Sequence, residues 1–193
     1  MKAKFGIVLI CIGSLLIASA LGLFLYFEKE QAAAAESVDK TLPKLASLVI
    51  ENAKREEETV ETPTEESTEE QKQLPEMDAV EIDGEMYIGF ISMPTLGLEL
   101  PIIQDWSYKK LKSAPCRYYG SIGGEDLVLM AHNYASHFGR IDELQPGDTV
   151  CFTDMDGIST WYQVTVRDLL PPTAVEEMTS GGRTPLRTDL KLF

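Results

Sequence analysis

Two histidines, His132 and His137, lie in one short segment, which reads Met-Ala-His-Asn-Tyr-Ala-Ser-His-Phe-Gly over residues 130–139. His132 directly follows the uninterrupted apolar run Leu127–Ala131, which is typical of a buried strand. Imidazole titrates near neutral pH, so a ring fixed at the end of a rigid strand suits a general acid or base. The alternative is a histidine that only caps the strand end through hydrogen bonds.

The same pair could instead hold a metal ion and make the protein a zinc hydrolase. However, four residues separate the two histidines, which matches no strong zinc signature, and no third ligand is evident. Asp154 and Asp156 could bind calcium, but a tight turn accounts for both carboxylates. We therefore expect no cofactor and no metal site, with calcium as the weak alternative.

Three cysteines, Cys11, Cys116 and Cys151, are too few and too scattered to form a disulfide framework. Cys11 lies in an apolar run near the N-terminus. Cys116 and Cys151 lie in the region of predicted strands, where a buried small apolar side chain is the usual role of a free cysteine. We do not expect either of them to be a nucleophile.

The elements that would position His132 are short apolar runs separated by turn residues. Strands are predicted at residues 86–93, 98–103, 127–131, 149–153 and 160–167, with a helical turn at 107–111. Asp154-Met155-Asp156-Gly157 has the composition of a hairpin turn. Many short strands with frequent turns indicate a mainly β domain, a closed or nearly closed antiparallel or mixed β-barrel that hides its strand edges.

The N-terminus predicts a transmembrane helix. From Phe5 to Phe27 the chain has 23 residues without a charge, enough to cross a hydrocarbon core of about 30 Å. Lys2 and Lys4 precede this run, so the N-terminus should be cytoplasmic and the remainder extracellular. The alternative is a signal peptide cleaved near Ala32–Ala35, although its apolar core would be unusually long.

The segment after the anchor predicts a stalk and a spacer. Helical spacing of apolar residues predicts a helix near residues 31–58, with Pro43 in the first turn of a helix that begins near Thr41. Residues 51–81 contain twelve acidic and three basic residues, which is typical of a disordered tether, with an acidic docking site as the alternative. The predicted division is 1–4 cytoplasmic, 5–27 transmembrane, 28–81 stalk and linker, and 82–193 β-barrel.

The net charge of −14 argues against a nucleic-acid partner.

An ordered set of motifs resembles the sortase family. The motifs are Ile88-Gly89-Phe90-Ile91-Ser92-Met93-Pro94, Leu100-Pro101-Ile102, Tyr118-Tyr119-Gly120-Ser121, Leu127–Asn133, His137-Phe138-Gly139, Leu144-Gln145-Pro146-Gly147-Asp148, and Pro171 with Val175-Glu176-Glu177-Met178. The resemblance covers residues 87–178, roughly half of the chain. A membrane anchor and an acidic spacer are what such a protein would carry.

The resemblance implies an eight-stranded barrel on the outer face of a Gram-positive bacterium. In that family a cysteine thiolate attacks an LPXTG-like sorting signal of a surface protein, and a peptidoglycan precursor or a pilin amine resolves the thioester. A nearby charged imidazole stabilises the thiolate, and an arginine steadies the oxyanion. His132 matches the catalytic histidine. His137 matches a second histidine, for which we expect a structural or groove role, and we expect Asn133 to contact substrate.

The chain departs from the family at its last strand, which there has the form T-L-x-T-C. Asp189-Leu190-Lys191-Leu192-Phe193 resembles that strand up to the position before Thr-Cys, while residues 182–188 are unlike the family. The sequence therefore predicts a barrel that is incomplete at the C-terminus and that lacks the catalytic cysteine and arginine. We expect a cysteine transpeptidase by descent with little activity in this polypeptide. The alternative is a membrane-tethered peptide-binding module.

Overall fold

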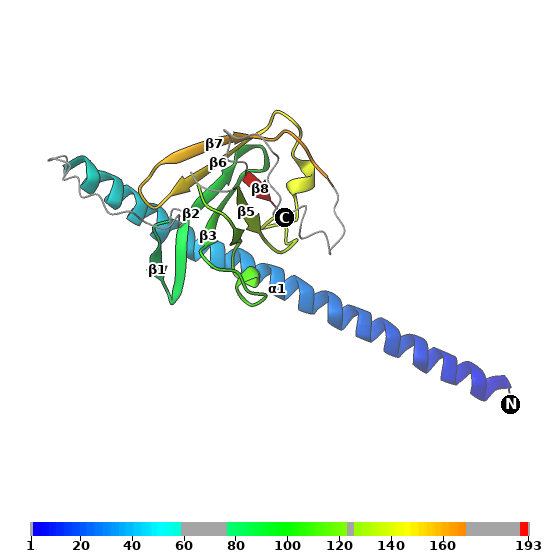
Figure 1. Ribbon diagram of the computed structural model, residues 1–193. Coiled ribbons are helices and arrows are strands. Elements are labelled where there is room, and N and C mark those ends of the chain that lie inside the picture. The colour runs from blue at the N-terminus through cyan, green and yellow to red at the C-terminus, as the bar shows by residue number, and fades with distance from the viewer. Residues whose placement is uncertain (1, 59–76, 123–125, 169–189, 193) are drawn as a thin grey trace.

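The computed structural model describes residues 2–58, 77–122, 126–168 and 190–192. A single long helix precedes a curled β-sheet (Figure 1). The elements are α1 (Lys2–Glu58), β1 (Val80–Ile82), β2 (Glu85–Met93), η1 (Pro94–Leu96), β3 (Leu98–Ile103), η2 (Lys110–Lys112), β4 (Cys116–Tyr119), β5 (Leu127–Met130), η3 (Ile141–Glu143), β6 (Thr149–Asp154), β7 (Ser159–Gln163) and β8 (Leu190–Leu192).

The strands form one mixed sheet in the order β7-β6-β2-β3-β4-β5-β8, and β1 pairs with β2 beside this path. The β3–β4 and β5–β8 pairs are parallel and the other pairs are antiparallel. Among the described residues β7 and β8 each pair on one side only, so the sheet is a half-barrel. The mainly β fold predicted from the sequence is confirmed.

Strand β2 contains a bulge and pairs with three strands, β1, β3 and β6. The β2–β3 register shifts between Tyr87 and Gly89, and Gly89 has φ 136°. A Cβ atom at Gly89 would lie 2.1 Å from the backbone oxygen of Thr153 on β6, so only glycine allows this close approach. The first part of β2 pairs with β1, while Gly89 to Ser92 pair with β6.

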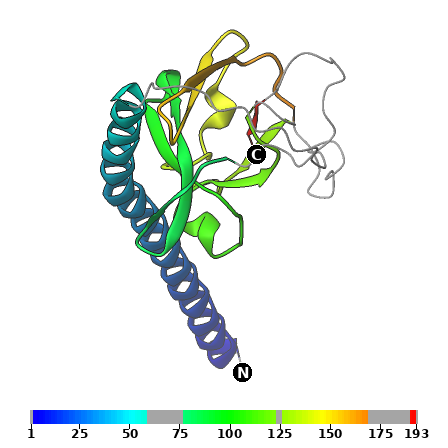
Figure 2. The ribbon, with the colours of Figure 1, turned by 60° about the vertical axis from the view of Figure 1, so that its left-hand side comes forward.

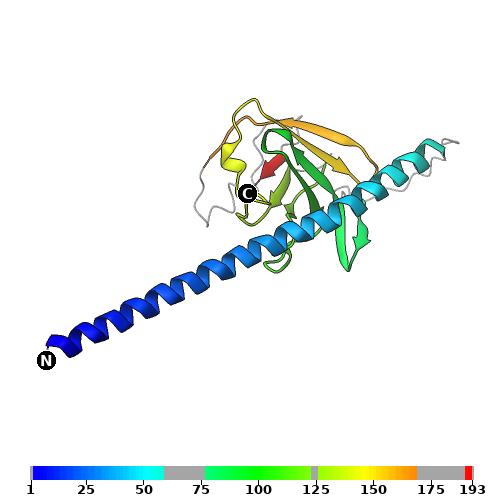
Figure 3. The same ribbon diagram turned by 180° about the vertical axis from the view of Figure 1, so that it is seen from behind.

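Helix α1 passes across the sheet and then extends well beyond it (Figures 2 and 3). In its C-terminal half, side chains three or four positions apart are buried, namely Ala34, Val38, Thr41, Leu45 and Val49. Its N-terminal half instead exposes large apolar side chains from Ile7 to Phe27. By length and composition this half can cross a membrane, with a mean hydropathy of 2.2 over the most apolar stretch.

The helix contributes to both apolar clusters of the domain. Val38 joins the cluster inside the curl of the sheet, which includes Ile88, Ile102, Leu129 and Phe152. Farther along the helix, Leu45 and Val49 join a second cluster, which includes Tyr87, Ile103, Cys116 and Met155. The C-terminal half of α1 is therefore part of the domain's core, rather than a stalk separate from it.

The helix differs from the expected division into an anchor and a stalk. Residues 2–58 form one helix, and Pro43 lies inside it rather than in a first turn. Proline removes one backbone donor, but the packing of Val38 and Leu45 on either side holds the helix against the sheet. The helix ends at Glu58 and so includes residues 51–58, where the predicted helix and the predicted disordered tether overlapped, and β1 begins at Val80. The centre of the predicted linker lies outside the described residues.

Candidate active site

His132 lies two residues beyond the end of β5, at one edge of the sheet. β8 runs parallel to β5, with Leu129 opposite Leu192. Paired residues of parallel strands project to the same face, and both strands run toward the edge that holds His132.

Three backbone hydrogen bonds fix the loop that follows His132. The amide of Phe138 donates to the His132 carbonyl at 3.3 Å, and the amides of His137 and Gly139 donate to the Tyr134 carbonyl at 2.8 and 2.9 Å. A Cβ atom at Gly139 would lie 2.4 Å from the carbonyl oxygen of Asn133, so the loop closes only around glycine. Asn133 is exposed beside His132, where a ligand could reach it.

The two imidazole rings lie on either side of Tyr134. The His132 and Tyr134 rings are stacked, with centroids 4.5 Å apart and planes 8° from parallel. The His137 ring packs against Tyr134 at 5.4 Å, with its plane tilted by 48°. Because Tyr134 is buried, this stacking fixes one face of the half-buried His132 ring while the remainder of the ring stays accessible.

His137 is completely buried, and neither ring nitrogen has a hydrogen-bond partner of normal geometry among the described residues. Burial is the main cause that lowers the pKa of His137 to about 4; the charge of His132 acts in the same direction, and the backbone of Ser113 opposes both. The neutral ring therefore acts as packing beneath Tyr134 in this structure. Its proposed contact with substrate stays a prediction.

Helix α1 contributes one member of a charged pair that lies beside the site. Glu30 is ion-paired with Lys112 of η2, and this hydrogen bond is the main reason that the pKa of Glu30 is lowered, with a smaller contribution from His132. Burial raises the pKa of Tyr134, and the Glu30 carboxylate raises it further. The Tyr134 hydroxyl has no partner of normal hydrogen-bond geometry among the described residues, so Glu30 acts on it chiefly as a nearby charge.

None of the three cysteines has the environment of a nucleophile. Cys116 is completely buried on β4, and desolvation raises the pKa of its thiol to about 12. Its sulfur contacts the Ala114 carbonyl at 3.5 Å. Cys151 is buried on β6, and Cys11 lies in the apolar half of α1. Because the thiolate is the reactive species, a buried thiol with a raised pKa is inert.

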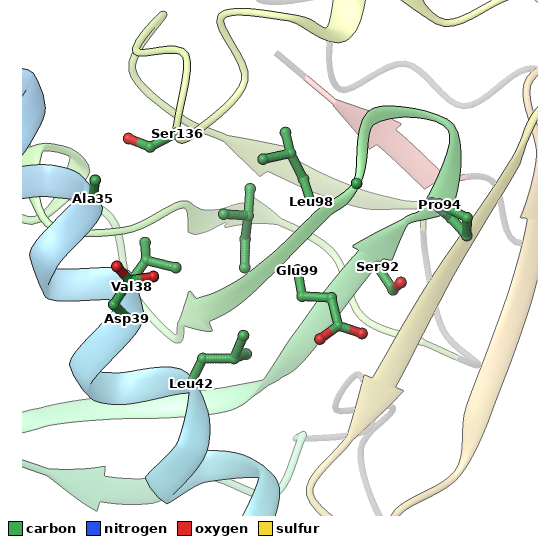
Figure 4. A pocket seen from close by; sticks show the side chains of 11 residues that line it. Ala35, Val38, Asp39, Leu42, Ser92, Pro94, Leu98, Glu99 and Ser136 are labelled. Atoms are coloured by element: carbon green, nitrogen blue, oxygen red, sulfur yellow. The ribbon is translucent and has the colours of Figure 1, made fainter.

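A groove of about 570 Å³ lies between α1 and the β2–β3 hairpin and reaches the loop of His132 (Figure 4). Val38 and Leu42 line one side, and Leu98 and Leu100 line the other. Ser136, from the His132 loop, closes one end. The groove is apolar with two carboxylates at its rim, Asp39 and Glu99.

The predicted calcium residues have a structural role. The Asp154 Oδ1 accepts hydrogen bonds from the amides of Asp156 at 3.1 Å and Ile158 at 2.8 Å, which closes the β6–β7 turn. Within the described parts of the chain, no group of three or more histidine, cysteine, aspartate or glutamate side chains could hold a metal ion.

Sequence reasoning missed three residues of the site. Tyr134 lies between the two histidines in sequence, so its ring could have been anticipated. Glu30 and Lys112 are far apart in the chain, and only the packing of α1 brings them to His132. No local pattern predicted that contact.

A search of curated proteins finds no match. Among solved structures, sortase C1 from Streptococcus suis is 27% identical over 48% of this chain and 55% of that chain, with a TM-score of 0.43. Sortase C1 from Streptococcus agalactiae is also 27% identical, over 52% and 54%, with a TM-score of 0.45. Sortase C from Streptococcus pneumoniae is 20% identical over 74% and 81%, with a TM-score of 0.47. The chain thus spans little more than half the length of the first two.

The model of the sortase domain matches residues 91–188, which is half of the chain. The matched region contains β3 to β7, the His132 loop and the β2–β3 side of the groove. On this match, together with the fold, the chain belongs to the sortase family.

Proposed function

We propose that this domain is a sortase-type cysteine transpeptidase site for LPXTG-like signals of surface proteins, held at the cell membrane by the apolar half of α1. The observation that carries the proposal is the position of His132 just beyond β5, at the edge toward which β5 and its parallel neighbour β8 both run. The single-pass topology, with the domain outside, follows from Lys2 and Lys4 before the apolar run.

His132 would serve as the acid that protonates the leaving amine, after stabilising a thiolate as imidazolium. The thiolate would attack the carbonyl carbon after the threonine of the signal, and the C–N bond would break as His132 supplies its proton. An amine from a peptidoglycan precursor or a pilin would then displace the thiol. A thiol at the third position after Leu192 would face His132 in the observed β5–β8 register.

Cys116 and Cys151 are buried and Cys11 lies in the apolar half of α1, which favours peptide binding over cleavage by these three thiols. The groove that Ser136 closes is the candidate site for an extended peptide. Asn133 is exposed in the same loop as Ser136. The alternative function is a membrane-tethered module that holds a sorting peptide without cleaving it.

Calorimetric titration of the full chain with an LPXTG-type peptide tests binding, and a scrambled peptide is the matched control. A fluorogenic version of the same peptide tests cleavage. We expect heat of binding for the true signal only, and no cleavage. Equal binding of both peptides would contradict a sorting-signal site.

A second experiment tests the position of the nucleophile. The chain is extended by Thr-Cys after Phe193, and the alkylation rate of the new thiol is followed against pH. We expect a thiol pKa below the ordinary value, because the imidazolium of His132 favours the thiolate. In the same extended chain, the substitution His132→Ala should return the pKa to its ordinary range. An identical pH profile in both chains would remove His132 from the proposed role.

A further inference from the structure

The long helix fixes the height of the domain above the membrane. Residues 2–58 form a single helix, so the packed half and the apolar half share one axis. The apolar run ends at Phe27, and Glu30 lies only about 4.5 Å farther along that axis. Each headgroup layer of a bilayer is about 5–7 Å deep, so Glu30 lies within it.

Contacts with Glu30 bring part of the domain to the same depth. Lys112 of η2 is ion-paired with Glu30, and His132 is close enough to influence the Glu30 carboxylate. In Figure 2 the segment around η2 forms the end of the domain that faces the N-terminal half of α1. The loop of residues 104–113 and the mouth of the site therefore lie at the level of the lipid headgroups.

The side chains of this loop suit that environment. Trp106 is 38% exposed and Tyr108 is 79% exposed, and their rings pack edge to face with centroids 5.6 Å apart. The ring of Tyr118 on β4 also packs against Trp106, with centroids 5.5 Å apart. Tryptophan and tyrosine are enriched at the boundary between hydrocarbon and water, because each ring has an apolar body and a polar tip.

The charges of the loop also allow it to approach an anionic lipid surface. The chain as a whole carries a net charge of −14, but Lys109, Lys110 and Lys112 are clustered here. Lys110 pairs with Glu85 at 3.0 Å, Lys112 pairs with Glu30, and Asp105 adds one negative charge beside them. Lys109 is exposed and takes part in none of the ion pairs found in the described part of the chain. The loop is thus close to neutral and can approach lipids that repel the remainder of the chain.

We propose that residues 104–113 dock on the surface of the bilayer that α1 spans, with Trp106 and Tyr108 inserted among the lipid headgroups. The inference rests on the proposed membrane anchor. Docking would hold the mouth of the site beside membrane-bound substrates instead of lifting it away on a flexible tether.

The test uses the full chain in phosphatidylcholine and phosphatidylglycerol vesicles. The chain has two tryptophans, so Trp161→Phe leaves Trp106 as the sole reporter, and Trp106→Phe leaves Trp161 as the matched control. Trp161 lies in the β6–β7 hairpin, whose turn is bound by Asn52, a residue about 33 Å farther along the helix than Glu30. Brominated lipids should quench Trp106 and leave Trp161 bright, whereas aqueous iodide should quench Trp161.

A second variant leaves the sequence of the loop unchanged, so its result does not depend on whether a substituted loop still folds. About seven helical residues inserted between Glu28 and Lys29 add roughly two turns, which raises the domain by ~10 Å on nearly the same helix face. Quenching of Trp106 by brominated lipid should then be lost while the chain still floats with the vesicles. Equal quenching of Trp106 and Trp161 in floating vesicles would overturn docking alone. Failure of the chain to float would overturn both docking and the anchor.

Discussion

His137 is a buried titratable ring without a hydrogen-bond partner of normal geometry among the described residues. Its pKa is lowered to about 4 in the folded state, against about 6.5 in an unfolded chain. Between these two values the unfolded state binds the extra proton, so acidification through this window favours unfolding. Above pH 6.5 the ring is neutral in both states and this contribution to stability is complete.

The resulting prediction concerns acid stability. As pH falls from 6.5 to 4, the free energy of unfolding should decrease by up to ~3 kcal/mol on account of His137, in addition to the effect of the carboxylates. His137→Phe should remove that part of the slope, because the substituted ring cannot take up a proton. Chemical denaturation across this pH range measures both chains. His132→Phe is the control, and a slope unchanged by His137→Phe would contradict a buried neutral ring.

Among the elements, α1 is the one whose role the sequence predicted least well. The strands at 85–93, 98–103 and 149–154, and the turn between β6 and β7, follow local patterns that the sequence shows directly. The packing of α1 does not follow from a local pattern. The spacing of Leu45 and Val49 would be the same whether these side chains contacted lipid, solvent or a sheet. Likewise, β4 contains Arg117 and two tyrosines, which lack the apolar run of β5, so it was not predicted.

A substitution at Leu45 tests how much the helix contributes to the stability of the core. Its side chain has no exposed surface and packs with Tyr87 and Met155 in the second apolar cluster. Leu45→Ala would remove buried methyl groups and leave a cavity, so the free energy of unfolding should decrease by roughly 2–5 kcal/mol. Denaturant unfolding in detergent micelles measures the loss. Ile50→Ala on the same helix is the control, because Ile50 is 56% exposed, and a loss as large there would show that the effect is not burial.

For the whole molecule, the anchor helix and the enzyme-like sheet should behave as one folding unit. Val38, Leu45 and Val49 are buried against the sheet, and full burial of such side chains stabilises by roughly 1.5–3 kcal/mol each. Their sum is comparable with the total stability of a typical domain, about 5–15 kcal/mol. A fragment of residues 29–193 should therefore unfold in a single transition, with helical circular dichroism and tryptophan fluorescence changing together. A fragment of residues 77–193, which keeps β1 but lacks α1, should have a markedly lower melting temperature or no cooperative transition. If the two fragments melted at the same temperature, α1 would be only a tether, and the depth at which it holds His132 would no longer be fixed by packing.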